Sequence, residues 1–203
     1  GTYGVIHPAP EIRLTEDSRI REGQVVYLSC YHALMMPGDQ MNCSLVEPKV
    51  FEICRQMVRA NQRLLQPDGW FLGYDEMRTG GWEPLEQQRF KTTGEALAYN
   101  VRRVSEIVRA EGGGKPMCVW SDMFDPHHNA HENYYMVANT LAGSWEGLPR
   151  DMLIITWFPQ RKSLEFFASR GHKQIVAGYY DADVQSNYQK WAPVSYTHLR
   201  AHE

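Results

Sequence analysis

The sequence lacks both a long hydrophobic run and an excess of positive charge. A transmembrane helix needs about 20 mostly apolar residues in a row, and the chain of 203 residues contains no such run. Its formal net charge is -3 at pH 7, and lysine and arginine do not cluster. We therefore expect neither a membrane nor a nucleic acid as a partner, because both of these anionic surfaces attract basic patches. Sugars or other near-neutral small molecules fit this charge better.

Cysteine is sparse, and it never occurs in the spacing of a metal or redox motif. The four cysteines are widely separated and form no Cys-x-x-Cys pair, so we expect free, mostly buried thiols rather than a zinc knuckle or a redox dithiol. Phosphate-binding loops are also absent, since neither Gly-x-Gly-x-x-Gly nor Gly-Lys-Ser/Thr opens a predicted helix. The sequence thus predicts no cofactor.

Four apolar runs of strand-like composition end in carboxylates or aromatic side chains. The runs are residues 70–76, 117–122, 152–157 and 174–181. Their final side chains are Asp75 with Glu76, Asp122, Trp157, and Tyr179 with Tyr180 and Asp181. Because the carboxyl ends of parallel strands meet at one edge of a sheet, we expect these side chains to converge. A carboxylate pair at the end of a buried strand is one way in which a barrel presents acid-base chemistry.

Helical patterns separate these runs. Residues 44–47 have the spacing of a capping box and Pro48 suits a first turn, so the sequence predicts a helix that reaches about Leu65. Thr93 is the expected N-cap of a second, strongly amphipathic helix, which the glycines at 112–114 end. Shorter helices are predicted over residues 132–141 and 163–170, and another strand over residues 24–32.

Strand and helix thus alternate about five times with short connections, which calls for a parallel sheet with helical crossovers. Since no phosphate loop marks an open nucleotide-binding sheet, the predicted fold class is α/β, a partial (β/α)8 TIM barrel. A whole barrel needs about 200 to 250 residues. We therefore expect residues 1–194 to form an incomplete barrel domain without its N-terminal strands and its last strand. Residues 195–203 look like adapter read-through at the end of a metagenomic reading frame, and we expect them to be a non-native tail.

The strand-end residues resemble those of glycoside hydrolase family 20, the β-N-acetylhexosaminidases. Other segments of the sequence are similar to bacterial members of this family. In that family an Asp-Glu pair ends the fourth barrel strand, where Asp75 and Glu76 stand here. A Tyr-x-Asp near the seventh strand end matches Tyr179 and Asp181. The resemblance covers residues 24–190. The family usually shows His-x-Gly-Gly-Asp-Glu, whereas Gly-Tyr precedes the pair in this chain.

This resemblance implies a retaining, exo-acting glycosidase in which the 2-acetamido group of the substrate acts as the internal nucleophile. Glu76 would be the general acid, Asp75 would orient the acetamido group, and the Tyr179 phenol would hold its oxygen. The other side chains expected to bind substrate are Arg78, Trp120, Asp122, His127, His128, Trp157 and Asp181. The expected partner is a carbohydrate, with an amino-sugar glycoside as the substrate.

Two other interpretations remain open. A non-catalytic barrel would keep the aromatic platforms and bind carbohydrate without hydrolysing it, and the unusual Gly-Tyr before the carboxylate pair motivates this alternative. A metal-dependent hydrolase would use the imidazoles and carboxylates of Asp122, Asp125, His127 and His128. The spacing in that segment matches no His-Glu-x-x-His motif, so we expect its histidines to bind sugar hydroxyls and predict no metal.

Overall fold

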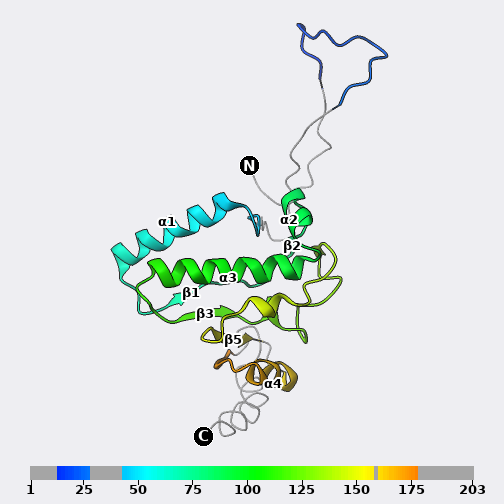
Figure 1. Cartoon of the computed structure of the whole chain (residues 1–203). Helices are drawn as coiled ribbons and strands as arrows, with labels where there is room; N and C mark the ends of the chain where they lie inside the picture. The colour runs from blue at the N-terminus through cyan, green and yellow to red at the C-terminus, as the bar shows by residue number, and fades with distance from the viewer. Residues whose placement is uncertain (1–12, 28–42, 158–159, 178–203) are drawn as a thin grey trace, which may run out of the picture. The chain divides into compact units, whose positions relative to one another are not determined.

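The computed structural model describes residues 13–27, 43–157 and 160–177 (Figure 1). The chain divides into two compact units, Gly1–Met41 and Asn42–Glu203. In the first unit, residues 13–27 contain two tight turns and neither helix nor strand. The strand predicted over residues 24–32 is therefore wrong for its first four residues, and the remainder lies outside the described residues. Val25 and Tyr27 are 82% and 96% exposed, so these two side chains are not buried.

Four strands of the second unit form a parallel sheet whose order follows the chain. They are β1 (Trp70–Phe71), β3 (Met117–Trp120), β5 (Leu153–Trp157) and β6 (Gln174–Ala177). Each strand pairs with the next one in the sequence, in the order β1-β3-β5-β6. In a barrel each strand lies beside the next one in the sequence, always in the same direction around the sheet. In a doubly wound sheet the strand order instead reverses at a switch point. The predicted α/β class with parallel strands is confirmed.

Helices occupy the connections between these strands, as the alternation predicted. Helix α1 (Pro48–Leu65) precedes β1, α3 (Thr93–Glu111) joins β1 to β3, and α4 (Arg161–Ser169) joins β5 to β6. Helix α2 (Pro84–Arg89) is a short addition that precedes α3. Helices α1 and α3 pack against each other (Figure 1), and none of the helices in the described residues is long and apolar enough to span a membrane.

The helix starts differ slightly from the predicted ones. The N-cap of α1 is Glu47, whose carboxylate accepts a hydrogen bond from the Lys49 N–H. The Ser44 hydroxyl instead accepts from the N–H groups of Val46 and Glu47, which makes a turn before the helix rather than a capping box. Helix α3 is capped by Thr92, one residue before the predicted position. The apolar periodicity therefore located both helices, and the choice among neighbouring cap residues depended on local backbone geometry.

The helix predicted over residues 132–141 is wrong. The chain makes turns there, and Asn133, Tyr135 and Asn139 adopt left-handed φ values of 60°, 42° and 52°, which interrupt an α-helix. Part of this segment pairs in parallel with the loop that follows β1, so these two loops lie side by side. The paired strands are β2 (Thr79–Gly80) and β4 (Met136–Val137), and the flanking 3-10 helices are η1 (Asp122–Phe124) and η2 (Ser144–Gly147).

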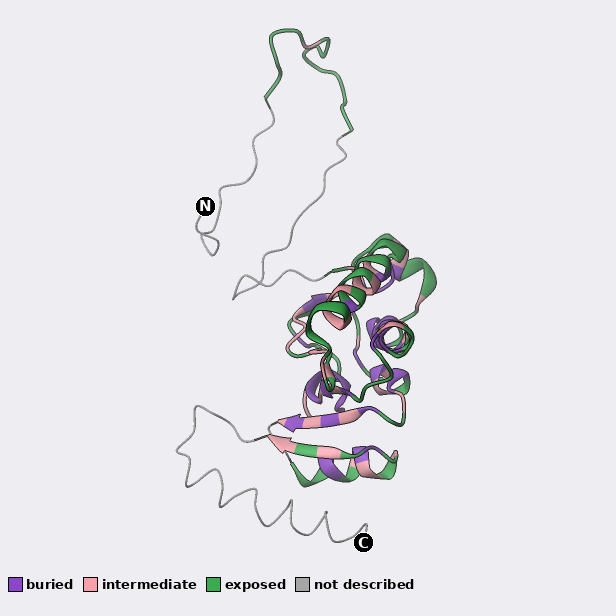
Figure 2. Cartoon of the chain, turned by 90° about the vertical axis from the view of Figure 1, so that its left-hand side faces the viewer, coloured by how far each residue is buried: buried purple, intermediate pink, exposed green. Residues whose placement is uncertain are grey.

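One face of the sheet is buried against the helices. Met117 and Val119 of β3 and Ile154 of β5 join α3 and α4 side chains such as Leu97 and Phe167 in a single core. Buried and half-buried residues alternate along β5 (Figure 2), because successive side chains of a strand point to opposite faces. The half-buried positions therefore form a second face, away from the helices. Since helices cover the outside of a barrel, this second face corresponds to its inner side.

Candidate active site

The chain turns sharply after β1. Trp120 N–H still donates to the Gly73 carbonyl at 3.0 Å, so the ladder between β1 and β3 extends as far as Gly73. Beyond it the backbone leaves the extended region, with φ values of 74° at Gly73, 67° at Tyr74 and 42° at Glu76. Such left-handed values are uncommon for tyrosine and glutamate and persist only where the surrounding structure holds them. The carboxylate pair therefore stands on a turn that depends on its neighbours.

Tyr74 anchors this turn in the protein interior. Its hydroxyl donates to Asn100 Oδ1 on α3 at 2.6 Å, and its ring packs edge-on against Phe124 at a centroid distance of 5.6 Å. Burial raises the pKa of the Tyr74 phenol far above its usual value. The phenol therefore stays protonated and keeps its role as a donor.

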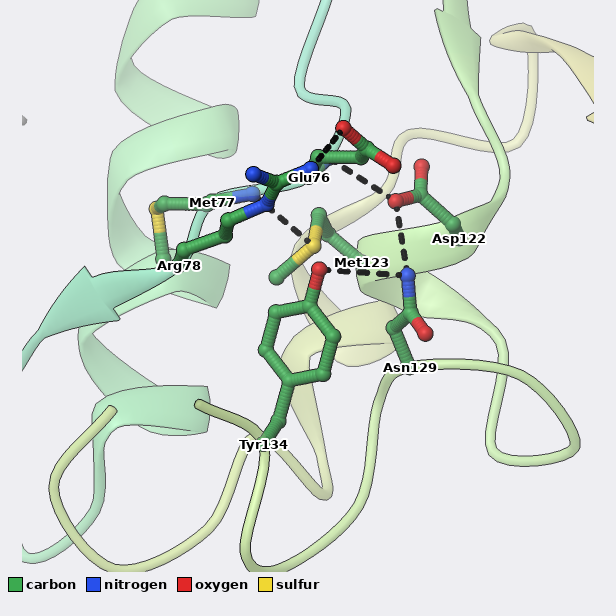
Figure 3. Close-up of polar contacts among 7 residues, drawn as sticks. All are labelled: Glu76, Met77, Arg78, Asp122, Met123, Asn129 and Tyr134. Atoms are coloured by element: carbon green, nitrogen blue, oxygen red, sulfur yellow. Dashed lines mark hydrogen bonds and ion pairs between the residues drawn. The ribbon is translucent and has the colours of Figure 1, made fainter. Parts of the chain in front are cut away.

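Asp122, at the end of the neighbouring strand β3, holds the same turn from another side. The Glu76 backbone N–H donates to Asp122 Oδ2 at 2.9 Å, and Asn129 Nδ2 donates to the same oxygen at 3.0 Å (Figure 3). The Asp122 side chain is 0% exposed. Asp122, which the sequence predicted to bind substrate, thus lies behind the carboxylate pair, where its Oδ2 accepts hydrogen bonds from protein groups.

Burial raises the pKa of the Asp122 carboxyl, and its hydrogen bonds oppose this shift. The opposing influences are the Glu76 N–H, the nearby Trp157 indole, the Asn129 amide and the charge of His128. Although the Trp157 indole faces the carboxyl, neither Asp122 Oδ1 nor Trp157 Nε1 has a partner in hydrogen-bond geometry among the described residues. One oxygen of Asp122 is therefore fully engaged in holding the turn, while the other is poorly satisfied.

The two carboxylates of the pair have different surroundings. The Asp75 side chain is exposed. The Glu76 side chain is 37% exposed, and its Oε2 accepts from Arg78 Nη2 at 2.7 Å. The Arg78 guanidinium also lies over the Tyr135 ring, 5.1 Å from its centre. Glu76 is thus accessible from outside and yet oriented by a neighbour, a combination that suits a group that exchanges a proton with a ligand.

Aromatic rings form a row across the inner face of the sheet. Phe71, Trp120 and Trp157 come from the successive strands β1, β3 and β5, and the ring centroids of neighbours are 5.2 Å and 6.5 Å apart. His128 continues the row, with its ring 5.0 Å from that of Trp157. The rings meet edge to face, as aromatic side chains prefer. They place apolar surface on the same side of the sheet as the turn that carries Glu76.

The two adjacent histidines occupy different environments. His128 lies close enough to Asp122, Asp125 and Glu76 to feel their charges, but burial outweighs these charges and lowers its pKa. The His127 ring instead packs against Phe166 of α4 at 6.1 Å, and its backbone N–H donates to Asp125 Oδ1 at 2.8 Å. The structure therefore brings His128 to the site and directs His127 toward α4.

The proposed metal cluster does not assemble in the part of the chain that the structure describes. No group of three or more His, Cys, Asp or Glu side chains is placed there to hold a metal ion. Of the four residues in this alternative, Asp122 contacts Glu76 and Asn129, whereas Asp125 caps a local turn. Tyr179 and Asp181, the two other side chains expected in the sugar site, lie outside the described residues.

Three residues at the site were not predicted from the sequence. Asn129 bridges Asp122 and the Tyr134 hydroxyl, with its Nδ2 3.4 Å from Tyr134 Oη (Figure 3), and Tyr135 contacts Arg78. All three belong to the long connection between β3 and β5, part of which was expected to be helical. The unusual composition near Asn129 was a signal, but it was assigned to the neighbouring histidines. Periodicity gave no indication of the two tyrosines.

Comparison with known proteins assigns a family to this arrangement. The model of the glycosyl hydrolase family 20 catalytic domain matches residues 26–200, which include the carboxylate pair and all four strands of the sheet. No curated protein matches the chain.

Proposed function

The chain belongs to glycosyl hydrolase family 20, a family of TIM-barrel glycosidases that act on carbohydrates, and on that premise we propose that it is a retaining, exo-acting β-N-acetylhexosaminidase. The observation that carries this proposal is the position of Glu76. Its carboxylate is partly exposed at the carboxyl end of the parallel sheet, while its backbone is fixed to the end of the next strand. Catalytic groups of TIM barrels stand at this end of the strands.

In the proposed reaction Glu76 acts first as an acid and then as a base. Glu76 gives its proton to the glycosidic oxygen as the bond from that oxygen to the anomeric carbon breaks. The carbonyl oxygen of the substrate's acetamido group forms a bond to the anomeric carbon in the same step. Glu76 then takes a proton from the water that opens this cyclic intermediate, so the anomeric configuration is retained and the enzyme returns to its first state.

The remaining side chains have supporting roles in this proposal. Asp75 and Tyr179 orient and polarise the acetamido group, and Asp181 binds sugar hydroxyls. Trp120 and Trp157 contribute apolar walls for the faces of the sugar ring, as their place on the inner face of the sheet supports. Arg78 stabilises the carboxylate that Glu76 becomes when it has donated its proton, because its guanidinium already pairs with that side chain.

Substitution of Glu76 by Gln in the full-length protein tests the role of this residue. Glutamine is similar in shape but has no proton to give, so hydrolysis of an aryl β-N-acetylglucosaminide with a poor leaving group should slow by about 10² to 10⁴-fold. A substrate with an activated leaving group needs little protonation and should be affected much less. The matched control is Glu83→Gln, an exposed residue whose side chain caps nothing. Equal loss with both kinds of leaving group, or no loss at all, would argue against Glu76 as the acid.

The role of the acetamido group needs a separate comparison. The wild-type protein should hydrolyse an aryl β-N-acetylglucosaminide and leave the matching aryl β-glucoside intact, because a 2-hydroxyl cannot act as the internal nucleophile. Hydrolysis of both substrates at similar rates would exclude substrate assistance. Binding of both without hydrolysis would instead favour the non-catalytic carbohydrate-binding barrel.

A further inference from the structure

We infer that Asp122 is a positioning residue that sets the direction of the Glu76 side chain, and that Asn129 holds Asp122 in place. This inference deepens the proposed function and rests on it, since the consequence for catalysis follows only if Glu76 is the acid and base. The positioning itself, however, can be measured without any substrate.

The backbone of Glu76 is held in an unfavourable conformation. With a φ of 42° this residue adopts a conformation that its Cβ makes unfavourable. Its N–H donates to a carboxylate at 2.9 Å, and a hydrogen bond to a charged acceptor is stronger than one between neutral groups. Because φ determines where the Cβ of Glu76 points, the oxygen that fixes this N–H also fixes the starting direction of the side chain.

Asp122, which accepts from this N–H, is buried. A carboxylate with a 0% exposed side chain is costly unless protein donors replace the lost water. Two donors meet at its Oδ2, the Glu76 N–H and Asn129 Nδ2. The described residues offer no donor in hydrogen-bond geometry to its Oδ1. The hydrogen bonds of the Asp122 carboxylate therefore converge on the oxygen that contacts the Glu76 backbone.

Asn129 holds both the side chain and the backbone of Asp122. The Asn129 side chain donates to the Asp122 carboxylate, and its backbone N–H donates to the Asp122 carbonyl at 3.2 Å. Asn129 Nδ2 also contacts the hydroxyl of Tyr134, which is buried. The loop after β3 thus fixes Asp122, and Asp122 in turn fixes the residue at the end of β1.

Asp125 provides a matched control on the same segment. Its side chain is buried as well, at 1% exposed, and its Oδ1 accepts from the backbone N–H of His127 at 2.8 Å. Like Asp122 it is a buried aspartate that holds a backbone N–H, but the N–H belongs to its own loop and not to Glu76. A general effect of losing a buried carboxylate should therefore appear in both Asp122 and Asp125 variants, and an effect on positioning in Asp122 variants alone.

The direct test is hydrogen exchange of the Glu76 backbone amide, measured by nuclear magnetic resonance. Asp122→Leu keeps a similar volume but removes the acceptor, so the Glu76 amide should exchange about tenfold faster, as expected when one hydrogen bond is lost. Asp122→Asn retains an acceptor and should stay within about threefold of the wild type, as should the matched control Asp125→Leu, which removes a buried carboxylate that does not contact Glu76. An unchanged Glu76 amide in the leucine variant would overturn the inference.

Kinetics connect the positioning to catalysis. Asp122→Leu should lower kcat about 10 to 100-fold with KM within about twofold, because the sugar still binds while the proton donor is misdirected. Asp122→Asn should recover most of this loss, and Asp125→Leu should leave kcat near the wild-type value. Loss of stability without loss of kcat in the leucine variant would show that Asp122 is merely structural.

Two further outcomes keep the inference separate from the proposed function. If the wild type hydrolyses no aryl glycoside, the proposed function falls, and the exchange of the Glu76 amide alone decides whether Asp122 positions that residue. If Asp122→Leu does not fold, Asn129→Ala is the substitute, because it removes one donor to Asp122 at a half-buried position. Asn129→Ala should make the Glu76 backbone amide exchange about threefold faster and should lower kcat about threefold. If neither the exchange rate nor kcat changes, the inference is overturned.

Discussion

The Tyr74 hydroxyl donates a 2.6 Å hydrogen bond to Asn100 Oδ1 and thereby ties the residue before the carboxylate pair to helix α3. Asn100 Nδ2 donates in turn to the Leu45 carbonyl at 2.8 Å, so one buried asparagine joins three segments of the chain. Tyr74 occupies a position where the resembled motif has glycine, and its φ of 67° is one that glycine adopts easily. The hydrogen bond to Asn100 accounts for how a tyrosine can hold this conformation.

Substitution of Tyr74 by Phe should lower the free energy of unfolding by about 1 to 3 kcal/mol. The change keeps the ring but leaves the buried Asn100 Oδ1 without its donor. An unsatisfied buried acceptor destabilises the folded state by more than the net free energy that a typical hydrogen bond contributes. Urea denaturation measures the effect. The control is Tyr99→Phe, because among the described residues the Tyr99 ring makes aromatic contacts and its hydroxyl makes no hydrogen bond. Equal stability of the two variants would contradict the role given to the Tyr74 hydroxyl.

Substitution of Arg78 should affect catalysis more than stability. The ion pair with Glu76 is partly exposed, at 20% and 37% for the two side chains, and such pairs contribute less than about 1 kcal/mol to folding. In the proposed reaction, however, negative charge develops on Glu76 as its proton leaves, and a fixed guanidinium stabilises that charge. Arg78→Leu should therefore lower kcat on poor leaving groups by about tenfold or more.

Arg78→Lys is the informative companion to this variant. Lysine keeps the charge but not the planar group that lies over Tyr135, so its kcat should fall between those of the wild type and the leucine variant. If the leucine variant instead keeps its full kcat, Arg78 serves only to pack the loop.

The sequence predicted the parts of the fold that local patterns determine. The apolar runs before Asp75 and Asp122 became adjacent parallel strands, and the periodicity of the longest helix was correct to within one residue at its N-cap. The helix predicted over residues 132–141 is wrong because residues such as Tyr135 adopt left-handed φ values and because the segment pairs with a loop 57 residues earlier. No local pattern encodes such a long-range pairing.

The site was predictable in position but not in environment. Strand ends located Glu76 and Asp122 together, because the chain must bring the ends of neighbouring parallel strands to one edge. Whether a carboxylate faces substrate or lies buried depends on the loops around it, and no local pattern indicates the contact between Asp122 and Asn129. Hydrogen-bond partners on loops follow from tertiary structure, so a single sequence cannot identify them.

Gly147 should not tolerate a side chain. A Cβ at this position would lie 2.1 Å from the carbonyl oxygen of Ala98 on α3, and backbone cannot move aside as a flexible side chain can. Gly147→Ala should therefore lower the free energy of unfolding by about 1 to 3 kcal/mol or more, the usual cost of overpacking. At Gly69 the nearest atom would be 3.5 Å away, an ordinary contact, so Gly69→Ala is the matched control and should change stability by less than about 1 kcal/mol. Similar midpoints in urea for the two variants would mean that the contact between η2 and α3 is looser than described.

His172 should make stability depend on pH. Its side chain is buried, with Nδ1 3.2 Å from the Met152 carbonyl oxygen, and burial lowers its pKa below the usual value. The unfolded chain therefore binds more protons than the folded chain at pH values just below about 6.5. It follows that the contribution of His172 to stability is fully present above about pH 6.5 and is lost as the pH falls from there through the lower folded-state pKa.

The variant His172→Gln removes this titration and keeps a group that can donate to the Met152 carbonyl. Urea denaturation at several pH values between about 7.5 and 5 should show a steeper loss of stability for the wild type than for the variant. His128, whose pKa is also lowered by burial, contributes with the same sign in both proteins, so the difference between the two curves isolates His172. The His172 ring is buried and packs against Phe167. Parallel curves for the two proteins would contradict this prediction, because they would mean that His172 binds a proton as readily in the folded protein as in the unfolded chain.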